Sequence, residues 1–365
     1  MKKFLYIILI LLNVITAISL VLACLCSFVN PKTIWWIGLF GLAYTYLLTI
    51  NVCFLIFWIF SRKKKMALIS LIPILFGWSF LGEYLQPFNK KISEEKKDRS
   101  IQVLLFNIQG FGQMNKKQSD GKMLNIYDFI REKDPDIICF QEFVISRWDK
   151  ELNEKHIIEK LKQTPYYYFE LHNRDYGSGV ATFSKYPIIY QELIYSDNTT
   201  NACICNDLLI GADTVRVYNI HLKSVGFQHE EKKLLDNAIK IGYDMSDIRT
   251  VKSIIRQIIT SSFDRAKQVE ILSSHIANSP YPVIICGDFN DPPTSYSYRK
   301  VRGNRKDAFV ESGSGRSTTY NIGHIASLRI DFILYSNVYK ACHYESPRVM
   351  ISDHFPVMCR LVKQE

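Results

Sequence analysis

Residues 284–291 read Ile-Ile-Cys-Gly-Asp-Phe-Asn-Asp, a short apolar run that stops at a cluster of polar side chains. A run of this length and composition is typical of a buried strand. Taken alone, the polar residues after it are ordinary turn formers, because their side chains cap backbone amides. Strand ends are also where layered α/β folds place ligands, so the neighbouring strands decide between the two interpretations.

Three other apolar runs end in the same way, each at a polar side chain. They are residues 101–106 before Asn107, residues 137–140 before Glu142, and residues 215–220 before His221. Near the C-terminus, Asp353 and His354 precede a further apolar run, and Asp331 lies inside one, where a charge is costly unless it is paired. We therefore expect these side chains to gather at one edge of a sheet.

Helical patterns alternate with the strands, at about residues 121–133 and 246–278. In the second pattern, apolar side chains recur from Val251 to Ile259 at the spacing of one face of a helix. Alternating strands and amphipathic helices predict an α/β domain, which we place at residues 101–365.

The polar cluster indicates a particular chemistry. Carboxylates and an amide without a usable cysteine form a hard oxygen site, which suits Mg²⁺ or Mn²⁺. Phosphoester hydrolysis needs positive charge on the phosphoryl oxygens, an aligned water and help for the leaving oxygen. Glu142 and Asn107 are suited to hold the metal, and Asn290 to donate to a phosphoryl oxygen.

Seven segments in the same order resemble the endonuclease/exonuclease/phosphatase superfamily, which includes deoxyribonucleases, abasic-site endonucleases, neutral sphingomyelinases and inositol-polyphosphate 5-phosphatases. The segments are residues 107–109, 141–142, 178–184, 219–222, 287–291, 329–332 and 352–356. The resemblance covers about residues 101–362. It implies a four-layered α/β sandwich, in which two packed β-sheets are flanked by helices.

The resemblance also implies roles for individual residues. The implied metal ligands are Asn107, Glu142 and Asp353, and the implied catalytic residues are His221, Asp288, Asn290, Asp331 and His354. His354 would contact the scissile phosphate, with Asp331 as its orienting carboxylate. Asp288 and Asn290 would position the water, and His221 would lie near the leaving group. Whether His354 or Asp288 is the general base stays open.

The substrate is the open part of this interpretation. Gln109 and His221 stand where abasic-site endonucleases usually carry Asp and Tyr, which disfavours that activity. Of 45 basic and 35 acidic residues, seven and one lie in residues 1–85, which leaves the rest a net charge of only +4. We therefore favour a lipid headgroup or a small phosphorylated metabolite over nucleic acid.

Two alternatives remain beside this function. A membrane-tethered endonuclease or exonuclease of the same fold is favoured by the basic residues within 299–306, which either form a solvated loop or contact phosphate. A catalytically inactive binding module is disfavoured, because every expected catalytic position is filled.

The N-terminal residues 1–85 predict a membrane anchor of about three transmembrane helices, followed by a polar linker at 86–100. The apolar runs are residues 4–29, 34–60 and 66–81, the last being short for a span. A cleavable signal peptide is the alternative for the first run. The basic residues 62–65 predict a cytoplasmic loop, and hence a multi-pass protein of the cell (inner) membrane with its catalytic domain outside the cytoplasm. The bilayer is the expected partner, and no protein partner is implied.

Overall fold

The computed structural model describes residues 2–87, 100–112, 125–173, 175–197, 199–226, 248–322 and 326–364. Most of the linker expected at 86–100, the first residues of the helix expected at 121–133, and residues 227–247 lie outside the described residues. The second expected helix is present as α9 (Ile248–Ala277), and the described part of the first is α6 (Ile126–Lys133).

Strand β2 (Ser100–Asn107) shows how alternating side chains build the layers of the C-terminal domain. Val103 and Leu105 point to one side of the strand and pack between two sheets. Leu104 and Phe106 point to the other side and pack against helices. Because side chains alternate along a strand, an uninterrupted apolar run is buried on both faces.

The strands form two six-stranded mixed sheets, in which β2 pairs in parallel with β3, and β8 with β9. The first sheet has the order β15 (Tyr339–Glu345), β16 (Val357–Lys363), β2, β3 (Ile137–Ser146), β5 (Tyr176–Ser184) and β4 (Tyr166–Leu171). The second has the order β10 (Lys306–Asp307), β14 (Asp331–Tyr335), β9 (Val283–Asp288), β8 (Asp213–His221), β7 (Ala202–Ile210) and β6 (Ile188–Ser196).

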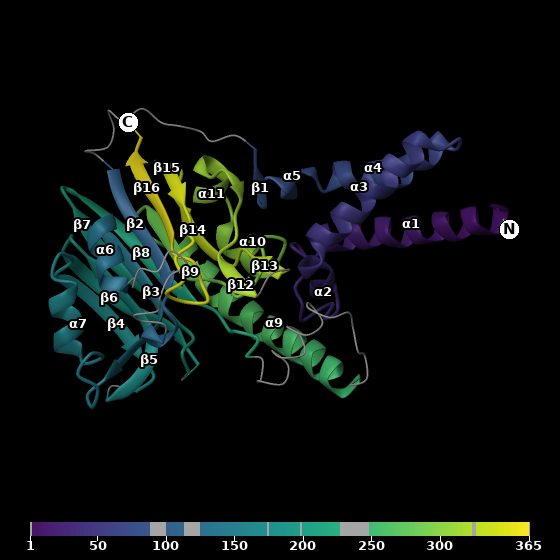
Figure 1. Cartoon of the computed structure of the whole chain (residues 1–365). Helices are drawn as coiled ribbons and strands as arrows, with labels where there is room; N and C mark the ends of the chain where they lie inside the picture. Colours follow the sequence, from purple (N-terminus) through teal and green to yellow (C-terminus); the bar gives the residue numbers. More distant parts are fainter. Residues whose placement is uncertain are drawn as a thin grey trace.

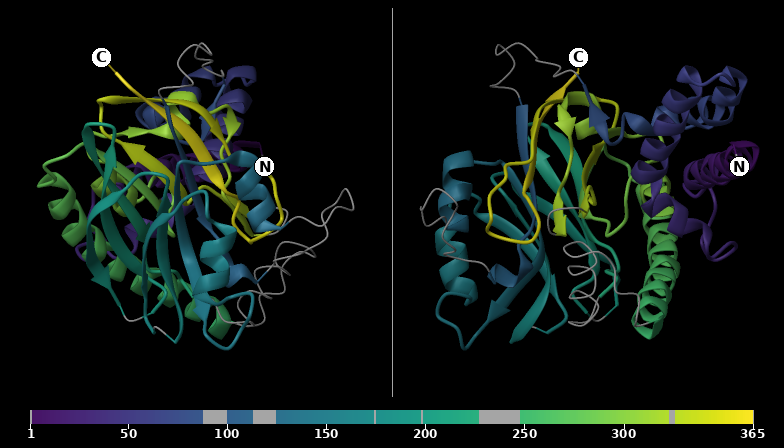
Figure 2. Two further views of the ribbon diagram at one scale, coloured as in Figure 1. Left: turned by 90° about the vertical axis from the view of Figure 1, so that its left-hand side faces the viewer. Right: turned by 45° about the vertical axis from the view of Figure 1, so that its right-hand side comes forward.

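Helices cover the outer faces of both sheets, which gives four layers (Figure 2). Helices α6 and α7 (Glu154–Lys160) pack on the first sheet, and α9 and α10 (Tyr296–Arg302) on the second. The remaining elements are short: η3 (Gln109–Phe111), α11 (Ala308–Ser312), β1 (Leu85–Gln86), β11 (Gly315–Arg316), β12 (Tyr320–Ile322) and β13 (Ala326–Leu328). This arrangement confirms the four-layered α/β sandwich.

The N-terminal helical unit, residues 2–84, contains α1 (Lys2–Leu25), α2 (Ile37–Leu42), α3 (Tyr44–Phe60), η1 (Lys64–Met66), α4 (Ala67–Phe76) and α5 (Trp78–Leu81). Among the described residues only α1 is long and apolar enough to cross a membrane, over 22 residues. The prediction of about three such helices is therefore not confirmed. The second apolar run is divided at Ala43, and α3 has only 17 residues. The third is divided at Gly77 and contains Pro73.

Polar side chains inside the unit tie its helices together. The Nδ2 of Asn13 on α1 donates to the Oγ of Ser70 on α4 at 2.6 Å. The Nε1 of Trp58 on α3 donates to the Oδ1 of the same asparagine at 2.8 Å. All three side chains are buried. Removing α1, as signal-peptide cleavage would, leaves the other two side chains without these partners.

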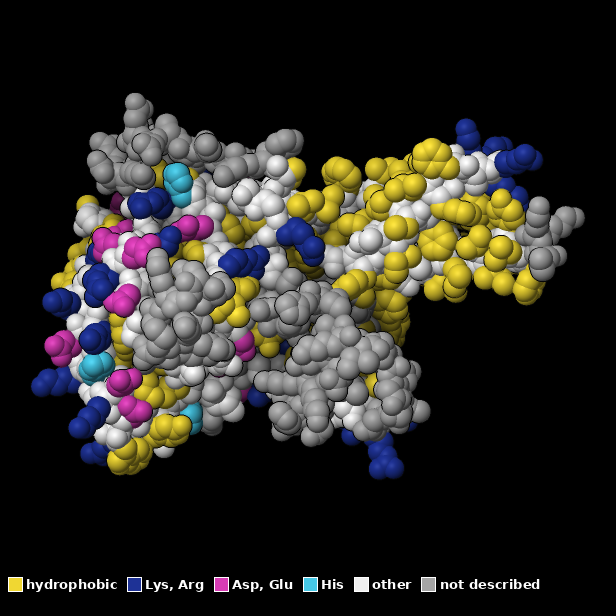
Figure 3. Space-filling view, in the orientation of Figure 1, with side chains coloured by type: hydrophobic (Ala, Val, Ile, Leu, Met, Phe, Trp, Pro, Cys, Tyr) yellow, Lys and Arg dark blue, Asp and Glu magenta, His cyan; other side chains and the backbone are white. Residues whose placement is uncertain are grey.

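The unit lies against the C-terminal domain, on the side of α9 and α10 (Figures 1 and 2). The N-terminus and the turn between α3 and α4 point away from the sheets, and the near end of the unit contacts the domain. The space-filling view shows an apolar surface along the projecting helices, with basic side chains at the far tip (Figure 3). We expected a linker to separate the two parts, whereas residues 85 and 86 already pair with β11 as strand β1.

Candidate active site

The polar residues at the strand ends meet at one edge of the two sheets. Asn107 ends β2, His221 ends β8, and Asp288 ends β9. In the second sheet Asp288 lies between two of the other residues. His221 is its partner on strand β8, and Asp331 is its partner on strand β14. Since parallel neighbours end at the same edge, the order of the second sheet brings His221, Asp288 and Asp331 together, and the packing of the two sheets adds Asn107.

Two of the residues at this edge have left-handed backbone conformations. Glu142 has a φ of 50° and lies at a bulge, where the register between β3 and β5 shifts from Gln141 to Phe143. Asn290 has a φ of 52°, two residues after β9. Bulges redirect a side chain that would otherwise follow the alternation of its strand. The Glu142 side chain is one-third exposed, whereas those of Asp288 and His221 are buried.

Asn107 links the carboxylates of the two sheets. Its Nδ2 lies 3.2 Å from Oε1 of Glu142 and 3.0 Å from Oδ2 of Asp288. Asp353 joins them indirectly, since the Nε2 of Gln109 donates to its Oδ2 at 3.2 Å and the backbone N–H of Gln109 donates to Oδ1 of Asn107. Asn107 and Glu142 are therefore in contact, and Asp353 stands one side chain away.

His354 and Asp331 form a buried pair. The Nδ1 of His354 lies 3.0 Å from Oδ2 of Asp331, and its Nε2 lies 3.7 Å from Oδ2 of Asp288. Burial alone would lower the pKa of His354, but Asp331 and Asp288 outweigh it and raise that pKa to about 10. Burial, together with Asp288, raises the pKa of Asp331 to about 6. At neutral pH the pair is therefore an imidazolium facing a carboxylate.

His221 differs from His354 in its partners. Its Nδ1 lies 3.0 Å from the backbone carbonyl of Thr200, which can only accept, so Nδ1 carries a proton. Its Nε2 is buried and has no hydrogen-bond partner among the described residues. The Nε2 points to Glu142 Oε1 at 3.9 Å and Asp288 Oδ2 at 3.7 Å. A buried polar atom left unpaired costs about 1–3 kcal/mol, so a bound group between these residues would relieve that cost.

The donor set fits a hard divalent cation. Asp288, Asp331 and His354 offer ligand atoms within 4.8 Å of one another. The ring of His354 already hydrogen-bonds to Asp331 through Nδ1, so only its Nε2 faces Asp288. Glu142 and Asp288 offer carboxylate oxygens on either side of the Asn107 amide, and oxygen ligands are what Mg²⁺ and Mn²⁺ prefer. The Oδ1 of Asn107 accepts from the backbone N–H of Gln109.

A buried amide pair under the site has no counterpart in the roles expected from the sequence. The Nε2 of Gln141 donates to Oδ1 of Asn219 at 2.7 Å, and the Nδ2 of Asn219 donates to the carbonyl of Ala181 at 2.9 Å. The pair connects the two sheets one residue before Glu142. The sequence marks this pair only by an amide side chain within each of two apolar strands, Gln141 in β3 and Asn219 in β8.

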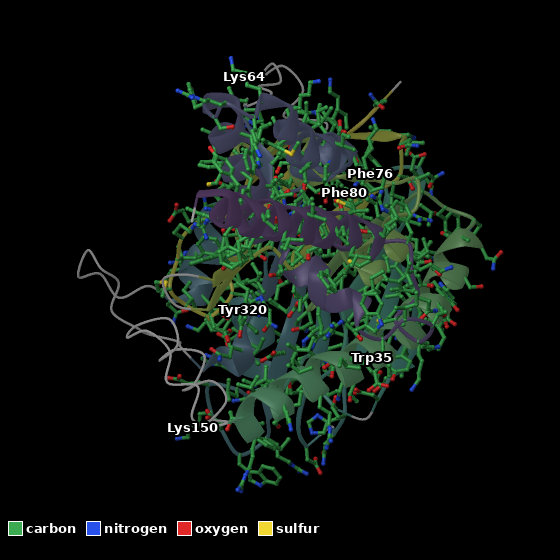
Figure 4. All side chains as sticks on the ribbon, turned by 90° about the vertical axis from the view of Figure 1, so that its right-hand side faces the viewer. Trp35, Lys64, Phe76, Phe80, Lys150 and Tyr320 are labelled. Carbon is green, nitrogen blue, oxygen red and sulfur yellow. The ribbon has the colours of Figure 1, made fainter. Side chains whose placement is uncertain are left out.

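Two arginines of the basic cluster 299–306, Arg299 and Arg302, contact other side chains and are not free to bind phosphate. The guanidinium of Arg299 stacks 5.1 Å from the ring of Phe28 and 5.2 Å from that of Phe80. Arg302 forms an ion pair with Glu83. All three partners, Phe28, Phe80 and Glu83, lie in the N-terminal helical unit, where Figure 4 labels Phe80.

A sequence model described as the endonuclease/exonuclease/phosphatase family matches residues 104–354. The chain belongs to this family. Members of the family hydrolyse phosphoester bonds, usually with a metal ion, so this member is a phosphoester hydrolase. A second model, described only as a domain of unknown function, matches residues 3–84.

Three solved structures are similar to this family member. An endonuclease/exonuclease/phosphatase from Beutenbergia cavernae has a TM-score of 0.50 and 15% identity, over 73% of this family member and 72% of that chain. Truncated TDP2 from Caenorhabditis elegans has a TM-score of 0.48 and 17% identity, over 73% and 100%. Sphingomyelinase C from Streptomyces griseocarneus has a TM-score of 0.46 and 14% identity, over 72% and 99%. No significant match is found among curated proteins.

Proposed function

We propose that this family member is a membrane-anchored, Mg²⁺- or Mn²⁺-dependent phosphoesterase, which hydrolyses a phosphodiester or phosphomonoester of a lipid headgroup or small metabolite. The observation that carries the proposal is the convergence of two histidines on one carboxylate at the edge of the sheets. The unpaired Nε2 of His221 and the Nε2 of His354 both lie 3.7 Å from the same oxygen, Oδ2 of Asp288. A phosphoryl group there would meet nitrogen atoms on two sides.

Each residue of the site has a separate role in the proposed hydrolysis. When bound, the metal ion at Glu142 and Asn107 supplies positive charge to the phosphoryl oxygens. His354 donates from Nε2 to a phosphoryl oxygen, because its raised pKa keeps it protonated at neutral pH. Asp288 is then the carboxylate that accepts the proton of the attacking water. His221, once its Nε2 also carries a proton, donates that proton to the leaving oxygen.

Asn290 and Asp353 complete the proposed site. The Nδ2 of Asn290 donates to the carbonyl of Leu222 at 3.0 Å, which fixes its amide and leaves a second N–H for a phosphoryl oxygen. Asp353 acts as the outer metal-site carboxylate, held by Gln109 at 3.2 Å.

The N-terminal residues 1–85 form the proposed anchor, in which α1, α3 and the segment formed by α4 and α5, residues 67–81, cross the bilayer. Their outward apolar side chains are exposed, and basic side chains gather at the end far from the sheets (Figure 3). The turn between α3 and α4, which carries Lys64, is at this end (Figures 1 and 4). Trp35 and Trp78 are exposed at the other end, as at a membrane–water interface. A 17-residue helix is about 25 Å long, just enough to span with slight thinning of the bilayer. Three crossings put the catalytic domain, residues 101–365, outside the cytoplasm.

The proposed substrate follows from charge. The part of the chain after residue 85 carries only +4, and two arginines of its basic cluster are engaged by the N-terminal helical unit. Duplex DNA binding depends on several Lys and Arg contacts that release counterions. A lipid headgroup or a small phosphorylated metabolite needs fewer such contacts.

The test is a substrate panel with the full chain purified in detergent micelles. Sphingomyelin-like lipids, inositol phosphates, single-stranded DNA and plasmid DNA are compared with Mg²⁺ or Mn²⁺, with EDTA as control. We expect metal-dependent release of phosphate or headgroup. Plasmid nicking that falls steeply with salt, without lipid or inositol-phosphate turnover, would establish the membrane-tethered nuclease instead.

A further inference from the structure

Thr294 of the catalytic domain forms hydrogen bonds with several residues of the N-terminal helical unit. Its side chain is fully buried. Its carbonyl accepts from the Sγ of Cys26 and the Oγ of Ser27, each at 2.7 Å. Its hydroxyl donates to the carbonyl of Gly41 at 2.9 Å. Residues from the end of α1 and from α2 thus converge on one threonine.

A further hydroxyl completes this contact. The Oγ1 of Thr294 lies 2.7 Å from the hydroxyl of Tyr84. Because the single proton of Thr294 is committed to the carbonyl of Gly41, the tyrosine hydroxyl must donate to Oγ1. A methyl group at Gly41 would meet the Sγ of Cys26 at 2.3 Å, so the backbone of α2 comes as close as it does only because residue 41 is glycine.

Thr294 lies on the loop that carries the proposed catalytic residues. It follows Asp288 by six residues and Asn290 by four. Between them, the carboxylate of Asp291 accepts from the Nε of Arg265 at 3.0 Å and from Ser297 at 2.8 Å. The loop is therefore fixed on one side by α9 and on the other by the N-terminal helical unit.

A second contact reaches the other catalytic strand. The backbone carbonyl of Glu83 accepts from Nη1 of Arg329 at 2.9 Å, and Arg329 is two residues before Asp331. The guanidinium of Arg329 is fully buried and paired with Asp307. Both contacts of the N-terminal helical unit thus lie within a few residues of groups that orient the proposed reaction.

We infer that Thr294 is a positioning residue, through which the N-terminal helical unit fixes the loop of Asp288 and Asn290 in its catalytic geometry. The inference rests on the proposed function for its kinetic consequence. Reacting groups must be held within a fraction of an ångström, and a misplacement of about 1 Å can cost roughly 100-fold in rate. The helices then serve turnover as well as attachment to the bilayer.

The test uses the full chain in detergent with Mn²⁺ and bis(p-nitrophenyl) phosphate, a small soluble phosphodiester. Thr294→Val removes the hydroxyl and keeps the shape, Thr294→Ser restores the hydroxyl, and Tyr84→Phe removes its donor. Thr164→Val is the matched control, because Thr164 is also a buried threonine bonded to a backbone carbonyl. We expect kcat to fall about 10-fold in Thr294→Val with KM within about twofold, a smaller fall in Tyr84→Phe, and recovery in Thr294→Ser.

Hydrogen–deuterium exchange of the peptide 284–300 gives a readout that needs no activity. We expect faster exchange in Thr294→Val than in wild type, and no change in Thr164→Val. Unchanged exchange in Thr294→Val, or an equal loss of kcat in Thr164→Val, would overturn the positioning role. An inactive wild type with the expected exchange pattern would refute the proposed function and leave the positioning role standing.

Discussion

Replacing Asp331 with asparagine removes the charge that faces the buried ring of His354 and keeps the size of the side chain. The two side chains are only 2% and 5% exposed. Removing one partner of a buried ion pair costs about 3–5 kcal/mol, because the other charge stays buried without compensation. Since the amide can still accept the hydrogen bond from Nδ1, we expect the lower end, about 3 kcal/mol, at pH 6.5.

The stability lost in Asp331→Asn should decrease as the pH rises. In the wild type, the pKa of His354 is raised from 6.5 to about 10 by Asp331 and Asp288 against the opposing effect of burial. A base with a raised folded-state pKa stabilises the fold fully below its unfolded pKa and loses that contribution as the pH approaches the folded value. In Asp331→Asn, burial is opposed only by Asp288 and Asp353, so the ring loses its proton more readily. The difference in stability between the two proteins should therefore shrink to about 1 kcal/mol at pH 10.

The assay is thermal unfolding of the full chain in detergent and EDTA at pH 6.5, 8 and 10. A difference of about 3 kcal/mol corresponds to a Tm lower by roughly 6–12 °C at pH 6.5. Asp128→Asn is the matched control, because Asp128 pairs with Arg131 on the exposed surface, and it should leave the Tm unchanged. A gap that stays constant from pH 6.5 to 10, or no gap at all, would refute the assignment of a charged buried pair.

Three further predictions concern the metal site, the helices and the topology. Glu142→Gln should lose at least about 100-fold in turnover. Its Tm should stay within about 2 °C of wild type, because the side chain is one-third exposed at a bulge. A variant that is fully active at the Mn²⁺ concentration used for the wild type would contradict the metal role. Asn13→Leu should lower the stability of the full chain in detergent by about 1–3 kcal/mol, since it leaves Ser70 and Trp58 unpaired, whereas Ile15→Leu on the exposed face should not; equal melting of the two variants would exclude a packed helical unit. Reporter fusions at residue 64 and at the C-terminus should report opposite sides of the membrane, and the same side for both would rule out three crossings.

The residue patterns were sufficient for an α/β domain and for the edge where the polar residues meet, and the four layers followed from the resemblance to the family. A strand that is buried on both faces appears in the sequence as a continuous apolar run. Each of these runs ends at a polar residue, and that residue lies at the edge of the sheet. His221 and Asp288 illustrate this, because their proximity follows from strand pairing alone, whereas Asn107 reaches Asp288 across the two packed sheets. The roles assigned to them stay predictions.

Other features depend on contacts between segments far apart in the sequence. The left-handed backbone of Glu142 follows from a bulge in the pairing of β3 with β5, which no local pattern marks. The division of the second apolar run at Ala43 goes together with the contact of α2 with Thr294, 253 residues away from Gly41. Arg299 and Arg302 resembled a free basic patch because their aromatic and acidic partners lie more than 200 residues earlier.

The central claim is that the two histidines and Glu142 form a metal-dependent site for phosphoester hydrolysis. Its most direct test is hydrolysis of bis(p-nitrophenyl) phosphate by the purified full chain, with Mn²⁺ and with EDTA, for the wild type and for His354→Ala. We expect turnover only with the metal and a loss of at least about 100-fold in the variant, while both proteins bind Mn²⁺ equally in a calorimetric titration. Turnover that persists in EDTA, or a His354→Ala variant as active as the wild type, would contradict the account.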